Sequence, residues 1–407
     1  MTPRTIFVVF VVALFVRLSG LLLLLPQLLP DQNPDYYREL GRNVASGKGF
    51  VAIAPDGREL PNINRPPAYP VFLAGLMKIF GDRLPVLLVA NCVLAAIGCA
   101  LTVVLASRWL KPGAAMIAGL LTVVEPNSVL RCGLVLTEPL FMLLFLSGFC
   151  VLVWQREKNY AWCLCGLFWG LATLCRAVAL WLPLVAIAAA FLWRMRPRHI
   201  ILFLIGFLPL IGLWIGRNAA LTGHVFFSTS SKNVMVTGWA ASLEAERTGI
   251  SVDLAAKQLI ARTGSIEFFE GHEAFEKTQQ EQTKVVHEIL GAQPGRLALK
   301  MIWGTAQTLV GPGGRMLETF LRDPRPTPRW WQILYMGMLL ALLATAVCGA
   351  ICHGRKLALL TILALYFVAL SVGPFGNSRF RYPIIPLLAI LAVASRAKPT
   401  ESSADAV

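Results

Sequence analysis

The chain has 407 residues, of which 56% are hydrophobic and only 14% are charged. This composition excludes an ordinary soluble globular protein and predicts a polytopic membrane protein. The net charge of +15 would suit a nucleic-acid partner, but much of it lies in short clusters at the ends of apolar segments, as the positive-inside rule expects. We therefore expect membrane lipids and no nucleic acid among the partners.

Ten apolar segments follow one another along the chain, and we expect each to cross the membrane as a helix. Several exceed about 18 residues without a charge, which is the length that spans the hydrocarbon of a bilayer. The first follows Arg4 and lacks an obvious small-residue cleavage site, so we interpret it as a retained signal anchor. The segments lie near residues 5–29, 84–107, 113–130, 134–154, 160–176, 177–193, 199–216, 330–352, 357–373 and 382–395.

Short basic clusters between these segments predict the orientation of the chain. Alternate connections carry Lys and Arg on the side of the N-terminus, which the positive-inside rule assigns to the cytoplasm. Both termini should then be cytoplasmic, in a cell (inner) membrane, and two long segments, 31–83 and 217–329, should be external or periplasmic. The clusters lie at residues 108–111, 156–158, 194–198, 355–356 and 396–398.

The first external segment, 31–83, is expected to hold juxtamembrane helices. Its start, "DYYRELGRNVASGKGF", places Tyr36, Tyr37, Leu40 and Val44 at helical spacing, and two glycines end the run. A Pro- and Gly-rich connection follows. The next apolar stretch, "AYPVFLAGLMKIF", is too short to span, so we expect it to lie at the interface or against the bundle.

The second external segment, 217–329, is polar and shows helical periodicity in three stretches, which predicts a helical cap. The predicted organisation is therefore a transmembrane core over residues 1–216, with a catalytic first loop at 31–83. The external helix-rich region follows at 217–329. C-terminal transmembrane helices and a short cytoplasmic tail occupy residues 330–407.

Charged residues at the external edge of the membrane are candidates for function, because a charge in or near hydrocarbon costs several kcal/mol. Glu138 begins an apolar segment on the external side, and we favour it as a functional residue over Glu125, which could equally be a helix cap. Arg17 lies inside the first segment and could snorkel or pair with a carboxylate such as Glu138. Arg176 is expected to mark a turn that faces the external leaflet.

Two groups of cationic residues predict an anionic ligand on the same face. Arg379 and Arg381, with Tyr382 beside them, precede the last segment against the positive-inside expectation, and guanidinium groups bind phosphate well. Arg217 and Asn218 end another span there and could also present donors. Together with Arg65, Glu138 and the acids of the first loop, these residues suit a lipid-borne phosphate and an acceptor that must lose a proton.

The order of these sequence motifs, and their expected position on one face of the membrane, resemble the GT-C superfamily of polytopic glycosyltransferases. The resemblance is to the branch of protein O-mannosyltransferases and aminoarabinose transferases in particular. The resemblance covers nearly the whole chain. It runs through "DYYRELGRNVASGKGF", "RPPAYPVFLAGL", "LTEPLF", "GLATLCRAVALWLPL", "GRNAALTGHVFFSTS" and "RFRYPIIPLLAIL".

The resemblance implies an enzyme that moves a sugar from a polyprenyl-phosphate donor to a lipid, glycan or protein acceptor on the external face. An inverting displacement would need one base and a cradle for the phosphate. In such enzymes an Asp of the first external loop is the base; here Asn33 stands at the commonest position, so Asp31 and Asp35 are both candidates. We favour Asp35, which opens the helix beside Tyr37, and expect Arg65, Arg217, Arg379 and Arg381 to hold phosphate.

Two other functions fit the same residues less well. A transporter or flippase of a lipid-linked saccharide would share a charged external cavity, but the matched halves and interrupted helices of transporters are not evident. A non-catalytic partner in an envelope complex is the second. No cofactor is implied with certainty, although the aspartates and Glu138 could bind Mg²⁺ or Mn²⁺ through oxygen.

Overall fold

The computed structural model describes residues 2–28, 35–54, 57–266, 271–313, 322, 326–374 and 376–396. Most of the described chain is helical. Two short strands, β1 (Val51–Ile53) and β2 (Glu59–Pro61), pair antiparallel as a hairpin in the first external segment. The sequence analysis expected only a connection there, because three-residue strands leave no alternating pattern to detect.

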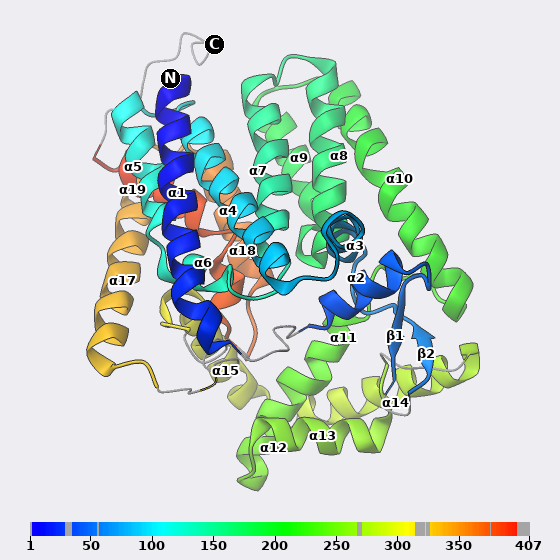
Figure 1. Cartoon of the computed structure of the whole chain (residues 1–407). Helices are drawn as coiled ribbons and strands as arrows, with labels where there is room; N and C mark the ends of the chain where they lie inside the picture. Colours follow the sequence, from blue (N-terminus) through cyan, green and yellow to red (C-terminus); the bar gives the residue numbers. More distant parts are fainter. Residues whose placement is uncertain are drawn as a thin grey trace.

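The bundle is built from helices that follow the predicted segments in order (Figure 1). It comprises α1 (Pro3–Leu24), α4 (Leu84–Ala106), α5 (Pro112–Val123), α6 (Pro126–Arg131), α7 (Glu138–Trp154), α8 (Asn159–Cys175), α9 (Leu182–Leu192), α10 (Pro197–Thr222), α17 (Arg329–Cys352), α18 (Ala358–Leu370) and α19 (Ile385–Ala394). Short 3₁₀ turns lie at Leu25–Gln27, Ala177–Ala179 and, as η4, at Ser378–Arg381.

Four of these helical stretches are long and apolar enough to cross a membrane: Pro3–Gln27, Leu84–Ala106, Pro197–Thr222 and Arg329–Cys352. The other helices of the bundle are apolar but shorter than 18 residues. The protein is therefore an integral membrane protein. The larger number of about ten crossings stays a prediction.

Close helix packing holds the bundle together, most visibly between α8 and α10. A Cβ atom on Gly206 would collide with the carbonyl oxygen of Cys163, and one on Gly166 would collide with that of Phe203. Only glycine lets two helix backbones approach so closely, which is how membrane helices gain packing contacts. At the centre, α4 is the most enclosed of the long helices and packs on α1, α5 and α7.

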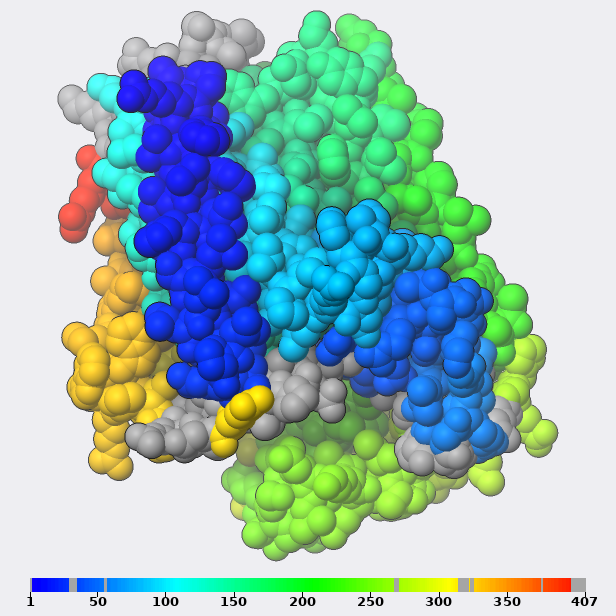
Figure 2. Space-filling model, viewed as in Figure 1, coloured from blue at the N-terminus to red at the C-terminus, as the bar shows by residue number. Residues whose placement is uncertain are grey.

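The first external segment folds back onto the bundle as predicted. Helix α2 (Tyr37–Ala45) buries Tyr37 and Leu40, and the chain then turns at Gly47 and Gly49, which have φ of 81° and 87°. Helix α3 (Ala68–Phe80) is seen end-on in Figure 1, across the direction of the bundle helices. Figure 2 shows α3 and the first segment on the front, between bundle and cap. This is the position expected of a helix at the membrane interface.

The second external segment forms a helical cap at the end of the bundle opposite to the start of α1 (Figure 1). Its elements are α11 (Ser230–Val234), a π-helical turn at Met235–Ala240, α12 (Ala241–Thr248), α13 (Val252–Thr263), α14 (Gly271–Ala292) and α15 (Pro294–Val310). Helices α13, α14 and α15 coincide with the three predicted stretches. The cap contacts the first segment where Ile63 packs against Ile266 and Phe275.

Candidate active site

Asp35 lies at the junction of the first external segment and the bundle. It immediately precedes Tyr36, whose φ of 45° places a bulky residue in the left-handed region. Such a conformation is costly for a side chain other than glycine and persists only where surrounding contacts enforce it, often at functional sites. The side chain of Asp35 is 13% exposed, so its carboxylate needs partners.

The two oxygens of Asp35 accept from two different arginines. Oδ1 accepts from Nη2 of Arg65 at 3.0 Å, and Oδ2 accepts from Nη1 of Arg379 at 2.5 Å. Arg65 comes from the same external segment, but Arg379 lies on η4, 344 residues away along the chain. The fold therefore brings two of the predicted phosphate-binding residues onto the favoured aspartate.

Arg379 also contacts Glu138, so its guanidinium bridges two carboxylates. Its Nε donates to Oε1 of Glu138, and its Nη2 donates to Oε2 at 3.3 Å. Nη1 of Arg176 lies 2.9 Å from Oε1 of Glu138 and also donates to Oγ1 of Thr137 at 3.1 Å. Glu138 is 1% exposed, which makes its two arginine partners essential in a low-dielectric setting.

We call Asp35, Arg65, Glu138, Arg176 and Arg379 the charged cluster. It holds three cations against two anions, so it carries one surplus positive charge. Burial alone would raise the pKa of Asp35, but the charges of Arg379 and Arg65 outweigh it and lower that pKa to about 2. Asp35 is thus ionised at neutral pH. Burial raises the pKa of the neighbouring Tyr37, which stays a neutral phenol.

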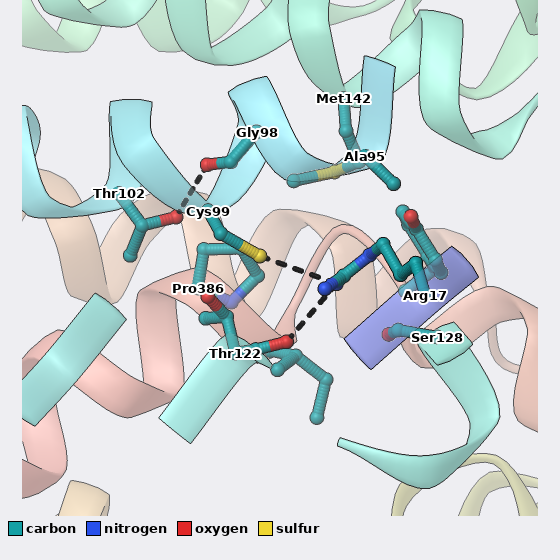
Figure 3. A pocket seen from close by; sticks show the side chains of 11 residues that line it. Arg17, Ala95, Gly98, Cys99, Thr102, Thr122, Ser128, Met142 and Pro386 are labelled. Atoms are coloured by element: carbon teal, nitrogen blue, oxygen red, sulfur yellow. Dashed lines mark hydrogen bonds between the residues drawn. The ribbon is translucent and has the colours of Figure 1, made fainter. Parts of the chain in front are cut away.

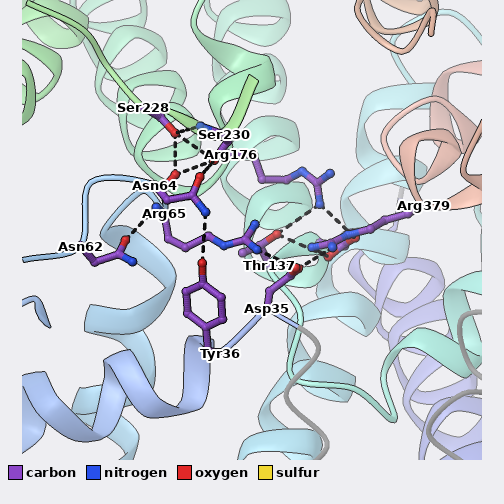
Figure 4. A network of polar contacts seen from close by, with 11 residues as sticks. Asp35, Tyr36, Asn62, Asn64, Arg65, Thr137, Arg176, Ser228, Ser230 and Arg379 are labelled. Atoms are coloured by element: carbon purple, nitrogen blue, oxygen red, sulfur yellow. Dashed lines mark hydrogen bonds and ion pairs between the residues drawn. The ribbon is translucent and has the colours of Figure 1, made fainter. Parts of the chain in front are cut away.

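A network of neutral hydrogen bonds joins the charged cluster to the cap (Figure 4). Nδ2 of Asn64 donates to the hydroxyl of Tyr36 at 3.1 Å, and the Oδ1 of Asn64 accepts from Oγ of Ser230 at 2.9 Å. The hydroxyl groups of Ser228 and Ser230 both donate to the backbone oxygen of Asn64 at 2.5 Å. The ring of Tyr36 lies against Arg65, with 5.1 Å between Cζ and the ring centroid. The cap thereby supports the turn that carries Asp35.

Five of the predicted site residues that the structure describes lie outside the charged cluster. Nη1 of Arg381 donates to the backbone oxygens of Thr308, Leu309 and Gly311, so it caps the C-terminus of α15. Two residues apart on η4, Arg379 and Arg381 point in different directions, which the sequence does not reveal. The structure therefore places Arg379 beside the predicted acids and Arg381 at the end of α15.

Arg217, Asn218 and Tyr382 also take structural positions. Arg217 donates to the backbone oxygens of Asn62 and Phe50, at 2.8 and 3.2 Å. These hydrogen bonds connect the first segment to α10. Asn218 donates to the backbone oxygen of Phe227 at 2.9 Å. Tyr382 is buried inside the bundle. Tyr37 lies beside the charged cluster, with its ring centroid 5.5 Å from Cζ of Arg65.

The pairing of Arg17 with Glu138 was a wrong prediction. Arg17 is buried on α1 and donates to the backbone oxygen of Thr122 and to Sγ of Cys99 (Figure 3). It also donates to the backbone oxygen of Ala13. Glu138 forms ion pairs with Arg176 and Arg379 instead. Glu125 caps a helix, which was one of the two roles expected for it. Its carboxylate accepts from the backbone nitrogen of Ser128 at 2.6 Å.

The sequence analysis missed the role of Arg176, Asn64 and the two serines. Arg176 was recognised as an external boundary residue, and its charge between two apolar stretches was the available signal. Nothing in the sequence distinguishes Asn64, Ser228 and Ser230 from the polar residues of any loop. Asp31, the other candidate base, lies outside the described residues.

Comparison with known proteins identifies a similar family and a similar fold. Residues 64–215 match the sequence model of the family described as dolichyl-phosphate-mannose-protein mannosyltransferase. The oligosaccharyltransferase of Archaeoglobus fulgidus, solved with a tethered acceptor peptide, superposes with a TM-score of 0.59 at 13% identity, over 97% of this chain and 49% of that one. The chain shares the fold of this oligosaccharyltransferase. The predicted resemblance to GT-C glycosyltransferases is confirmed as a resemblance of fold and of this part of the sequence.

Two further solved structures match the chain. AglB from Archaeoglobus fulgidus, in complex with an inhibitory peptide and a dolichol-phosphate, has a TM-score of 0.56 at 14% identity, over 96% of this chain and 50% of that one. ArnT from Cupriavidus metallidurans, bound to undecaprenyl phosphate, has a TM-score of 0.43 at 16% identity, over 97% and 78%. No curated protein sequence matches the chain. The chain spans about half the length of the oligosaccharyltransferases it matches.

Proposed function

We propose that the protein is a membrane glycosyltransferase that moves a sugar from a polyprenyl-phosphate donor to a lipid, polysaccharide or protein acceptor of the cell envelope. The observation that carries this proposal is the charged cluster itself, in which one arginine, Arg379, joins Asp35 of the first external segment to Glu138 of α7. The GT-C fold and the family match over residues 64–215 support the same activity.

In the proposed reaction, Asp35 is the base. An acceptor hydroxyl or amine attacks the anomeric carbon, the bond from that carbon to the phosphate oxygen breaks, and the acceptor proton passes to the Asp35 carboxylate. The leaving group is polyprenyl phosphate. An inverting displacement of this kind needs no covalent intermediate.

The three arginines would stabilise the phosphate as it leaves. Guanidinium groups stay charged at all relevant pH values and match the geometry of phosphate oxygens. A phosphate that engages Arg379 competes with Asp35 for the same donors. Loss of that ion pair raises the pKa of Asp35 from its low value near 2, so donor binding converts a weak base into a stronger one.

A divalent cation fits this arrangement poorly. The carboxylates of Asp35 and Glu138 both accept from Arg379, which stands between them. Within the part of the chain that the structure describes, no three His, Cys, Asp or Glu residues come together as metal ligands. We therefore assign the stabilisation of the leaving phosphate to the arginines and derive no step through Mg²⁺ or Mn²⁺.

We also propose the orientation that the basic clusters predict. The charged cluster and the cap would face the external or periplasmic side of the inner membrane, where a polyprenyl-linked sugar meets envelope acceptors, and both termini would be cytoplasmic. In this proposal residues 1–216 form the transmembrane core, 217–329 the external region and 330–407 the last membrane helices with a short tail.

The experiment that tests the proposed function is a comparison of glycans in cells with and without the gene. We expect the deletion strain to lack one sugar on an envelope lipid, polysaccharide or protein and to accumulate the corresponding polyprenyl-phosphate sugar. Wild-type protein should restore the sugar, and Asp35→Asn at equal abundance in the membrane should not. Unchanged envelope glycans and lipid-linked sugars in the deletion strain would refute the proposal.

A further inference from the structure

Arg17 is a buried cation without a carboxylate partner. It lies on α1 at 1% exposure, and its partners are the backbone oxygens of Ala13 and Thr122 and the sulfur atoms of Cys99 and Cys132, none of which is a carboxylate. Among the described residues no Asp or Glu pairs with it. Because an unpaired charge inside a membrane bundle is costly, Arg17 calls for a compensating anion.

The carboxylate of Glu125, whose partner Ser128 lines the same cavity, already has hydrogen-bond donors. Glu125 Oε2 accepts from the backbone and the hydroxyl of Ser128, at 2.6 and 2.5 Å, and Oε1 accepts from the hydroxyl of Tyr335. Ser128 lines the same cavity as Arg17, whereas Glu125 does not. Glu125 therefore does not form an ion pair with Arg17.

Two hydrogen-bond donors of this region remain without acceptors among the described residues. The Nε of Arg17 is buried and has no hydrogen-bond partner. Arg17 lines a cavity of about 20 Å³ between α1, α4, α5, α7 and the start of α19 (Figure 3). Tyr382 lines the same cavity, and its hydroxyl makes no hydrogen bond to another described residue. The hydroxyl protons of Thr102 and Thr122 are directed to backbone oxygens of their own helices.

We propose that this cavity binds a small monovalent anion, with chloride as the physiological species. A cavity of this size admits one water-sized particle, which excludes a phosphate or a sugar. A halide accepts from both unpartnered donors and neutralises Arg17, whereas a water molecule satisfies the hydrogen bonds and leaves the charge. The site would stabilise the contact of α1 with α4 and α5, independently of sugar transfer.

The test is the thermal stability of the purified full-length protein in lipid nanodiscs. Sodium chloride replaces sodium gluconate at constant ionic strength and pH, and the unfolding midpoint is followed by intrinsic fluorescence. We expect a saturable increase of about 2–4 °C with chloride and with bromide. Equal midpoints in chloride and gluconate would overturn the proposal.

Three variants distinguish the proposed site from a general salt effect. Arg17→Gln should lose the chloride dependence, and Arg4→Gln, an exposed residue at the start of the same helix, should keep it. Tyr382→Phe removes one donor and should raise the half-saturating chloride concentration about 5- to 10-fold, which corresponds to one hydrogen bond. If Arg17→Gln retains the wild-type response, or if Tyr382→Phe leaves the half-saturation unchanged, the assignment is wrong.

Discussion

The ionisation of a single residue, Asp35, should make the stability of the protein depend on pH in the acid range. Its pKa of about 2 lies below the unfolded value of 3.8, so its ion pairs contribute fully above about pH 4 and are lost as the pH falls through 2. The contribution is roughly 2 kcal/mol at about 1.4 kcal/mol per pKa unit. Wild type should therefore unfold at a higher temperature than Asp35→Asn at pH 5, and the difference should vanish near pH 2. A constant difference over this range would contradict the ion-pair assignment.

Glu138 should be the most sensitive carboxylate of the charged cluster for stability. Glu138→Gln leaves the buried guanidinium groups of Arg176 and Arg379 with one negative charge fewer, and breaking a buried pair typically costs about 3–5 kcal/mol. The matched control is Glu157→Gln, since Glu157 pairs with Arg156 at 73% exposure and such pairs contribute about 1 kcal/mol or less. Thermal unfolding of both variants checks this. Equal decreases in the unfolding temperature of the two variants would contradict the argument that burial makes the ion pairs of Glu138 more important than that of Glu157.

Single residues also show what the sequence could and could not predict. Asp35, Arg65, Glu138 and Arg379 were predictable because each is a charge at the external edge of an apolar segment. Arg381 was predictable only as a cation, since its neighbour Arg379 turns to the cluster while it caps α15. The direction in which a side chain of a 3₁₀ turn points depends on tertiary contacts, so the local sequence pattern does not predict it.

At the scale of elements, the Asn64 network should act on catalysis by positioning the base. Ser230→Ala removes the hydroxyl that holds Asn64, and Asn64 in turn holds Tyr36 beside Asp35. Small displacements of a base cost rate rather than binding, so we expect kcat to fall about 10-fold with KM unchanged. Ser230→Thr should restore the rate. Ser231→Ala, at the exposed neighbouring position, is the control; equal kcat values for the two alanine variants would exclude a positioning role.

The contact of α8 with α10 should tolerate no added atom. Gly206→Ala places a Cβ against the backbone oxygen of Cys163 and should destabilise the protein by about 1–3 kcal/mol. Gly212→Ala, in the same helix, meets nothing within 4 Å and should be neutral or slightly stabilising. The comparison is made by thermal unfolding, and equal midpoints would show that the two helices separate freely.

The helices were predicted more accurately than the hairpin and the connecting loops, because the length of an apolar segment and a 3.6-residue periodicity are strong local signals. The three cap helices and α2 fall where the spacing placed them. The hairpin of β1 and β2 was not predicted, since its strands are stabilised by Asn43 and Glu39 of α2 rather than by their own pattern. The hydrogen bonds that join the first segment to Arg217 and Ser228 likewise connect residues more than 150 positions apart, so they depend on the tertiary fold rather than on a local pattern.

For the whole molecule, the fold explains why residues far apart in the sequence form one site. The first external segment, the start of α7, the turn after α8 and η4 all reach the same end of the bundle, and the cap covers them from outside (Figure 1). Asp35 and the three arginines proposed to bind phosphate then lie together. This arrangement is what an enzyme that uses a lipid-borne donor requires.

The most direct test of the central claim is sugar transfer by purified protein in lipid nanodiscs, with a radiolabelled polyprenyl-phosphate sugar and envelope extract. Wild type should transfer the label to an acceptor. Asp35→Asn should be slower by about 100-fold or more, as expected for loss of a general base. Asp253→Asn, an exposed residue of the cap, should match wild type. Wild-type rates in a folded Asp35→Asn variant would contradict the account.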